Sequence, residues 1–211
     1  HGAPTIIGVD VARQGGDRSS IFVRKGRDAR TFPPIILKGA KNDVVAGKVV
    51  EQLELLRAMG YRPIVNVDVG AGTGVIDILH MRGVKANEID FGGSPYDGDK
   101  YKNRRAEMYG RSRRWLMGGC LVDHRELEDD LAGPEYRYTD RGDGAAVVLE
   151  SKDEMRARGL ASPDVGDSFV LTFAEDVVRE DLYDLFSPRT GGSRKERIAA
   201  GVGDAWNPFD T

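Results

Sequence analysis

Residues 5–11, TIIGVDV, form an apolar, β-branched run that is interrupted by a single carboxylate, Asp10. Such a run, bounded by Pro4 and a polar segment, is typical of a buried β-strand. An ionised carboxylate inside an apolar strand is costly unless a partner or a metal ion compensates its charge. The segment therefore predicts a core strand that carries a polar site.

A hairpin partner follows this first strand. Residues 20–24 (SIFVR) have the alternating character of a second strand. In residues 31–38, Pro33 and Pro34 confine a third strand to an edge or shorten it to residues 35–38. The N-terminal part of the chain thus predicts a small antiparallel arrangement.

A parallel crossover unit is expected next. A helix over residues 42–60 precedes residues 63–69 (PIVNVDV), which have the composition of a buried strand. The glycine-rich residues 70–74 (GAGTG) are expected to turn the chain into a helix that ends near Gly83, and residues 84–90 supply another strand. Because strand, helix and strand in this order form a parallel crossover, the fold class is α/β, with a mixed central sheet flanked by helices.

The second half of the chain predicts further helices and an added β-hairpin. A basic helix over residues 103–117 is followed by a short helix around residues 127–131. Strands at residues 135–139 and 145–150 are joined by the turn DRGDG, a hairpin signal. The last clear helix begins at residues 162–164 and runs toward Val178.

Composition limits the class of protein. The chain has 211 residues with 40% hydrophobic residues, which is enough for one ordinary domain with a real core. The 31 basic and 34 acidic residues give a net charge of −3, so any nucleic-acid binding must come from a local basic patch. One cysteine, no membrane span and no signal peptide pattern favour a soluble cytosolic protein without membrane association.

Four carboxylates occupy informative places. Asp10 lies inside the first strand, Asp68 ends the strand at residues 63–69, and Asp164 and Asp167 begin the last helix. If they converge, all-oxygen ligation favours Mg²⁺ or Mn²⁺, and two ions roughly 3.5–4 Å apart can promote phosphodiester hydrolysis. The alternative is that each is satisfied by backbone amides or by an arginine such as Arg13.

A family resemblance begins at this first strand. Residues 8–12 and 16–20 resemble the G-x-D-x-A…G-x-D-x-S opening of the nuclease domain of the tailed-bacteriophage terminase large subunit, in the ribonuclease H-like superfamily. Similar segments follow in the family's order over roughly residues 5–174, namely VDVG at 67–70, NRRAEMY at 103–109, LESK at 149–152 and SPDVGDS at 162–168.

The resemblance implies roles for particular residues. Asp10, Asp68, Asp164 and Asp167 would be catalytic metal ligands for Mg²⁺ or Mn²⁺, with either of the last two as the main third ligand. Lys152 would lie near the metals and neutralise phosphate charge, unless it is a solvated lysine at a helix start. The implied function is a two-metal-ion endonuclease that cleaves concatemeric viral double-stranded DNA during genome packaging, with little sequence specificity.

The resemblance also implies partners and a location. A portal protein, the small terminase subunit and an ATPase domain of the same full-length protein would be partners in the host cytoplasm. The chain has no G-x-x-x-x-G-K-[ST] phosphate loop, so the ATPase is expected elsewhere. We expect a nuclease domain at residues 1–186, with residues 1–4 as a cloning remnant, and a flexible C-terminal tail at residues 187–211.

The basic helix is the best candidate for phosphate contacts in an acidic protein. Its expected DNA-binding residues are Arg104, Arg105, Arg111 and Arg114, together with Lys152. A run of charges is, however, more often a solvated helix face. The histidines show no zinc spacing, and residues 70–74 lack the full G-x-G-x-x-G dinucleotide fingerprint.

Two other functions remain open on the sequence. A ribonuclease H-like module that has lost catalysis could hold DNA or a portal partner. A resolvase-like nuclease or a transposase-like strand-transfer enzyme would share the carboxylate arrangement. Cation response would separate the first from an enzyme, and cleavage products on branched and linear DNA would separate the second.

Overall fold

The structure is a computed structural model that describes residues 2–12, 18–141 and 144–175. The predicted tail at residues 187–211 lies outside these ranges, as does residue 178, toward which the last helix was expected to run. Within the described residues that helix ends earlier than expected, at Leu171. Within the described ranges, no helix is long and apolar enough to cross a membrane.

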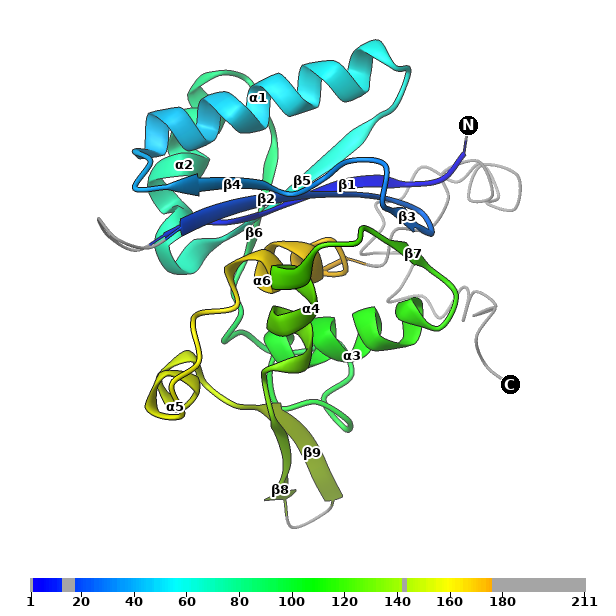
Figure 1. The fold of residues 1–211 in the computed structure, drawn as a ribbon, viewed down its shortest axis with the longest axis vertical. Coiled ribbons are helices and arrows are strands. Elements are labelled where there is room, and N and C mark those ends of the chain that lie inside the picture. Colours follow the sequence, from blue (N-terminus) through cyan, green and yellow to red (C-terminus); the bar gives the residue numbers. More distant parts are fainter. Residues whose placement is uncertain (1, 13–17, 142–143, 176–211) are drawn as a thin grey trace, which may run out of the picture. The chain divides into compact units, whose positions relative to one another are not determined.

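A seven-stranded mixed sheet forms the centre of the fold (Figure 1). Its strands follow the order β6 (Ala86–Ile89), β5 (Pro63–Asp68), β1 (Thr5–Asp10), β2 (Arg18–Lys25), β3 (Asp28–Ala29) and β7 (Cys120–Leu121), while β4 (Ile35–Lys38) pairs with β2. Strand β1 runs antiparallel to β2 and parallel to β5, and β5 runs parallel to β6. The predicted hairpin, crossover unit and mixed sheet are confirmed.

Helices cover both faces of this sheet (Figure 1). Along β1 the side chains alternate between faces, so Ile7 and Val9 pack in one buried cluster with α1 (Asn42–Ala58) and α2 (Val69–Met81). The opposite face, toward which Gly8 and Asp10 are directed, is covered by α6 (Asp164–Leu171).

A second core lies on the α6 side. It joins the sheet to α3 (Arg104–Leu116), α4 (Arg125–Ala132) and α6. The ring of Phe169 packs edge-on against Phe22, with centroids 5.1 Å apart, and against Trp115, with centroids 5.7 Å apart. Aromatic pairs in this arrangement add to the burial of apolar area and hold α6 in place.

Helix α6 approaches β1 unusually closely, because position 8 has no side chain. A Cβ atom at Gly8 would collide with the backbone carbonyl oxygen of Ser168. Two polar contacts fix the same helix. The hydroxyls of Ser20 and Ser168 lie 2.8 Å apart, and Asn66 Nδ2 donates to the Leu171 carbonyl at 2.8 Å. The beginning of α6 is thereby held beside the end of β1.

The added β-hairpin is also confirmed. Strands β8 (Tyr136–Arg141) and β9 (Gly144–Leu149) pair antiparallel, and in Figure 1 they extend away from the central sheet. Helix α5 (Lys152–Ala157) follows directly, and a capping box formed by Ser151 and Glu154 starts it.

One local expectation is wrong. Residues 70–74 do not form a turn before the helix but lie inside α2, which begins at Val69 directly after β5. Asp68 is the N-cap of this helix, and its carboxylate accepts a hydrogen bond from the Gly70 N–H at 3.2 Å. The short strands β3 and β7 have no counterpart in the sequence-based expectations.

Candidate active site

Two carboxylates end neighbouring parallel strands. Val9 of β1 is registered with Val67 of β5, so Asp10 and Asp68, one residue further on, lie side by side on the face covered by α6. Both are buried. The predicted proximity of these two residues follows directly from the pairing of their strands.

Helix α6 brings two further carboxylates to the same end of the sheet. Asp164 is at its start, lines a pocket together with Asp10 and Asp68, and lies 3.7 Å from Arg18. Asp167, one turn later, is completely buried. The four predicted ligands are therefore gathered at one end of β1 and β5, with Asp164 toward the pocket and Asp167 beneath it.

Asp130 of α4 stabilises the start of α6. One of its carboxylate oxygens accepts hydrogen bonds from the backbone N–H groups of Val165 and Gly166, at 2.9 and 3.0 Å. These N–H groups have no partner within the helix. Nothing in the sequence singles out Asp130, because it lies 34 residues before the helix that it caps.

Lys152 lies between the carboxylates of Asp10 and Asp167. Its ammonium group is 3.5 Å from Asp10 Oδ2 and 2.9 Å from Asp167 Oδ2. Burial lowers the pKa of Lys152, but the charges of Asp167 and Asp10 outweigh burial and hold this pKa above its ordinary value. Lys152 is therefore a cation built into the site, and not a solvated lysine at a helix start.

Asp167 has further partners on α3. Arg105 Nε donates to Asp167 Oδ1 at 3.2 Å, and the hydroxyl of Tyr109 donates to the same oxygen at 2.9 Å. Burial raises the pKa of Asp167, yet Arg105 and Lys152 together hold it below the ordinary value. Asp167 is thus ionised and joins α3, α5 and α6 beneath the pocket.

Asp10, Asp68 and Asp164 differ from Asp167, because their pKa values are raised above the ordinary value. Burial raises the pKa of Asp10 well above its ordinary value, although Lys152 opposes this, and the other three carboxylates raise it further. Burial likewise raises the pKa of Asp68 to about 6, again against Lys152. The pKa of Asp164 is also raised by burial. A cluster that resists ionisation in this way is favourable for a bound cation, which would lower all three pKa values.

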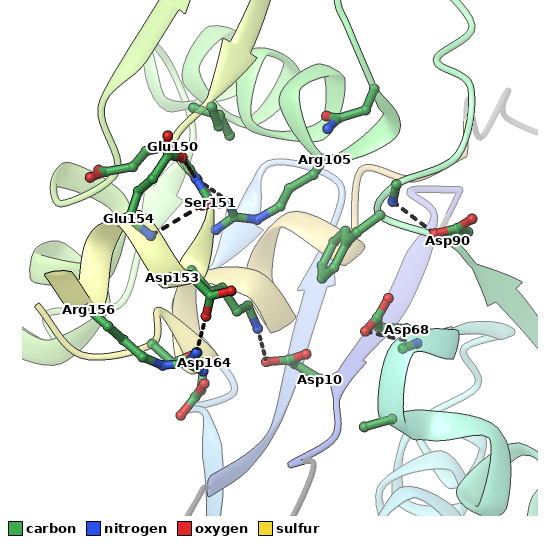
Figure 2. A pocket seen from close by; sticks show the side chains of 18 of the residues that line it. Asp10, Asp68, Asp90, Arg105, Glu150, Ser151, Asp153, Glu154, Arg156 and Asp164 are labelled. Atoms are coloured by element: carbon green, nitrogen blue, oxygen red, sulfur yellow. Dashed lines mark hydrogen bonds and ion pairs between the residues drawn. The ribbon is translucent and has the colours of Figure 1, made fainter.

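These residues surround a single pocket of about 490 Å³ (Figure 2). Asp10, Asp68 and Asp164 line it, and Figure 2 shows Arg105 on the α3 side. Asp90 also lines the pocket, directly after β6, whose last residue Ile89 is registered with Asp68. Three adjacent parallel strands therefore end in, or are followed by, an aspartate.

The donor chemistry of this pocket fits a hard divalent cation. The side chains that could bind a metal ion here are aspartates, which offer oxygen atoms. Mg²⁺ and Mn²⁺ prefer oxygen ligands. As placed, the side chains of the described ranges form no group of three acidic, histidine or cysteine residues around a common point. In this arrangement the ammonium group of Lys152 supplies the positive charge between Asp10 and Asp167.

The predicted DNA-binding helix is largely a structural element. Arg104 and Arg105 are buried, and both donate to backbone carbonyls, of Ala174 and Glu150 respectively. Arg111 pairs with Glu107 at 3.0 Å. Burial and these internal partners argue against phosphate contacts by Arg104 and Arg105, which corrects the expectation for them. Arg114 is exposed, with its guanidinium 3.1 Å from the hydroxyl of Tyr101.

Sequence reasoning missed several pocket residues. Asp90 carried the same signal as Asp10 and Asp68, a carboxylate at the end of a predicted strand, and could have been found by that rule. Phe91, beside it, also lines the pocket, and its backbone accepts a hydrogen bond from the Arg105 N–H at 3.0 Å. Arg156 lines the pocket from α5. No motif points to Phe91 or Arg156.

Comparisons with known proteins agree on the fold. No family model matches the chain, and no curated protein matches it. Among solved structures, the nuclease domain of the large terminase subunit gp2 of bacterial virus Sf6 superimposes with a TM-score of 0.62 and 17% identity, covering 83% of this chain and 89% of that one.

Two related structures carry metal ions. A mutant of the same Sf6 domain with manganese and beta-thujaplicinol matches with a TM-score of 0.59 and 16% identity, over 83% of this chain and 89% of that one. The large terminase nuclease of thermophilic phage G20c with bound magnesium matches with a TM-score of 0.55 and 16% identity, over 82% of each chain. The chain therefore has the ribonuclease H-like fold of terminase nuclease domains.

Proposed function

We propose that this chain is a nuclease domain that hydrolyses DNA phosphodiester bonds with divalent metal ions, Mg²⁺ or Mn²⁺, during packaging of a viral genome. The observation that carries the proposal is the gathering of Asp10, Asp68, Asp164 and Asp167 at one end of β1 and β5, where the first three open onto a pocket. Structural neighbours of this fold are nucleases, some of which hold manganese or magnesium.

Asp10 and Asp68 are the proposed principal metal ligands. Asp164 and Asp167 are both kept as candidates for the third ligand, since Asp164 lines the pocket and Asp167 lies beneath it. Divalent ions bound there, two in our proposal, would polarise the phosphate and stabilise the leaving oxygen. Hydrolysis of this kind needs no covalent enzyme intermediate.

The protein's own cations have separate tasks in this proposal. Lys152 neutralises charge between Asp10 and Asp167 and is near enough to the pocket to pair with a phosphate oxygen once other cations hold the carboxylates. Arg105 and Tyr109 keep Asp167 fixed and ionised. Both act as positioning residues, because their contacts are with Asp167.

Metal binding and nicking can be tested on the same variants. Asp10→Asn and Asp68→Asn should each abolish plasmid nicking in Mn²⁺ and abolish the rise in melting temperature that Mn²⁺ gives the wild type. Asp77→Asn, which removes an exposed carboxylate of α2 outside the pocket, is the matched control and should change neither result.

The outcomes separate the proposal from its alternatives. Full nicking by either pocket variant contradicts the assignment of these carboxylates. If neither Mn²⁺ nor Mg²⁺ changes the melting temperature of the wild type, the result would favour a docking module without catalysis. Preference for branched over linear DNA would favour a resolvase-like nuclease. The packaging partners, namely an ATPase domain of the full-length protein, a portal and a small subunit, belong to the same proposal.

A further inference from the structure

Two exposed arginines line the pocket from its hairpin and α5 sides. Arg137 is on β8 and Arg156 is on α5, and their side chains are 59% and 53% exposed. Both border the same pocket as Asp10 and Asp68. In Figure 2, Arg156 and its partner Asp153 lie across the pocket from Asp68. The pocket therefore has carboxylates at the strand ends and exposed positive charge at its rim.

The present partners of these arginines are easily exchanged. Arg137 Nη1 lies 3.1 Å from Glu154 Oε1, and Arg156 Nη1 lies 2.6 Å from Asp153 Oδ1. Glu154 and Asp153 are themselves exposed. Ion pairs between exposed side chains contribute little to stability, so a phosphate can replace either carboxylate at small cost. Arginine is also well suited to phosphate, because its planar guanidinium can donate two parallel hydrogen bonds.

The arginines at the start of α3 differ in each of these respects. Arg104 and Arg105 are buried, and their donors are used by Ala174, Glu150 and Asp167. Freeing Arg105 for a phosphate would leave the buried Asp167 carboxylate without its main partner. The first two arginines of the charge run in α3 are therefore not available to a ligand.

An approaching polyanion needs local positive charge at this pocket. The chain as a whole has a net charge of −3, and the strand-end carboxylates repel phosphate. We propose that Arg137 and Arg156 contact backbone phosphates of the DNA strand that enters the pocket, so that DNA lies across β8 and α5 and not along α3. This inference rests on the proposed nuclease function, and it assigns the surface that receives the substrate.

Binding in EDTA tests this surface without cleavage. Fluorescence anisotropy with a short labelled duplex over a series of salt concentrations gives both affinity and the number of phosphate contacts. The test variant is Arg137→Ala with Arg156→Ala. The matched control is Arg113→Ala with Arg114→Ala, which removes the same charge from exposed positions on α3. Asp153→Asn removes the carboxylate that competes for Arg156.

The inference predicts three binding results and one control result. The test variant should bind roughly tenfold more weakly, with a salt slope smaller by about 2, since each lost phosphate contact lowers the slope by about 0.9. The α3 control should keep the wild-type slope. Asp153→Asn should bind more tightly than the wild type, by a few-fold. All variants should keep the wild-type rise in melting temperature with Mn²⁺, which shows that the carboxylate pocket is intact.

Three results would overturn it. These are a wild-type salt slope in the test variant, an equal or greater loss in the α3 control, and no duplex binding by the wild type at low salt. Each leaves the metal proposal standing where Mn²⁺ still raises the melting temperature. Loss of that Mn²⁺ response in the wild type would instead be a failure of the proposed function.

Discussion

Replacing Asp68 by asparagine should make the metal-free protein more stable while removing its proposed function. Asp68 is 9% exposed, and burial raises its pKa to about 6. A carboxyl group whose pKa rises from 3.8 to about 6 on folding destabilises the folded state, when ionised, by about 3 kcal/mol. Asparagine has no charge to bury, and its side-chain oxygen can still accept from the Gly70 N–H.

The expected gain depends on pH with a definite sign. Because the folded pKa is raised, the penalty is absent below about pH 3.8, grows as pH rises through the window from 3.8 to about 6, and is complete above it. The pKa of about 6 already includes the attraction to Lys152, so we expect a gain of up to about 3 kcal/mol at pH 8. Each kcal/mol corresponds to roughly 2–4 °C in melting temperature for a domain of this size.

Differential scanning fluorimetry in EDTA at several pH values between 4 and 8 measures this directly. Asp68→Asn should melt several degrees above the wild type at pH 8, and the difference should shrink as the pH falls toward 4. Adding Mn²⁺ should reverse the order, because only the wild type gains stability from the ion. A variant that melts below the wild type in EDTA at pH 8 would refute the reasoning, since it would show that Asp68 stabilises the fold as an ionised residue.

Three further substitutions test the roles of single residues. Asp167→Asn should cost about 3–5 kcal/mol in urea unfolding, because Arg105 loses its buried counter-ion. Asp164→Asn, which changes a residue that lines the pocket, should cost less than about 1 kcal/mol, and equal costs would contradict the role of Asp167 as the counter-ion of Arg105. Asp130→Ala should lower stability by about 1–3 kcal/mol, because two backbone N–H groups of α6 lose their acceptor, and Asp130→Asn should restore most of the loss in the same assay. Gly8→Ala should lower the free energy of unfolding by about 1–3 kcal/mol or more, because α6 must move away from β1. A melting temperature equal to that of the wild type, measured by circular dichroism, would contradict this close approach.

The part of the site that sequence could predict depends on strand pairing. Asp10 and Asp68 occupy the same position in two neighbouring parallel strands, and the apolar runs that contain them identify the strands. Once the crossover unit is recognised, their proximity is a geometrical necessity. Asp90 follows from the same rule applied to β6.

The part that sequence could not predict depends on contacts between distant residues. The arginines of α3 look like a solvated or DNA-binding face, because nothing in residues 103–117 shows that Asp167 and Ala174, more than fifty residues later, will take up Arg105 and Arg104. The turn expected at residues 70–74 failed for a local reason. The Asp68 side chain caps the helix at its first residue, so the glycines continue the helix instead of preceding it.

The proposed ligand set comes from opposite ends of the described chain, from Asp10 in the first strand to Asp167 in α6, the last described helix. During translation, strands β1 and β5 leave the ribosome long before α6 does. A nascent chain therefore lacks two of the four proposed ligands, and lacks the helix that packs against Gly8, until synthesis has passed residue 171. The proposed metal site would therefore be completed only when the last described helix has been made.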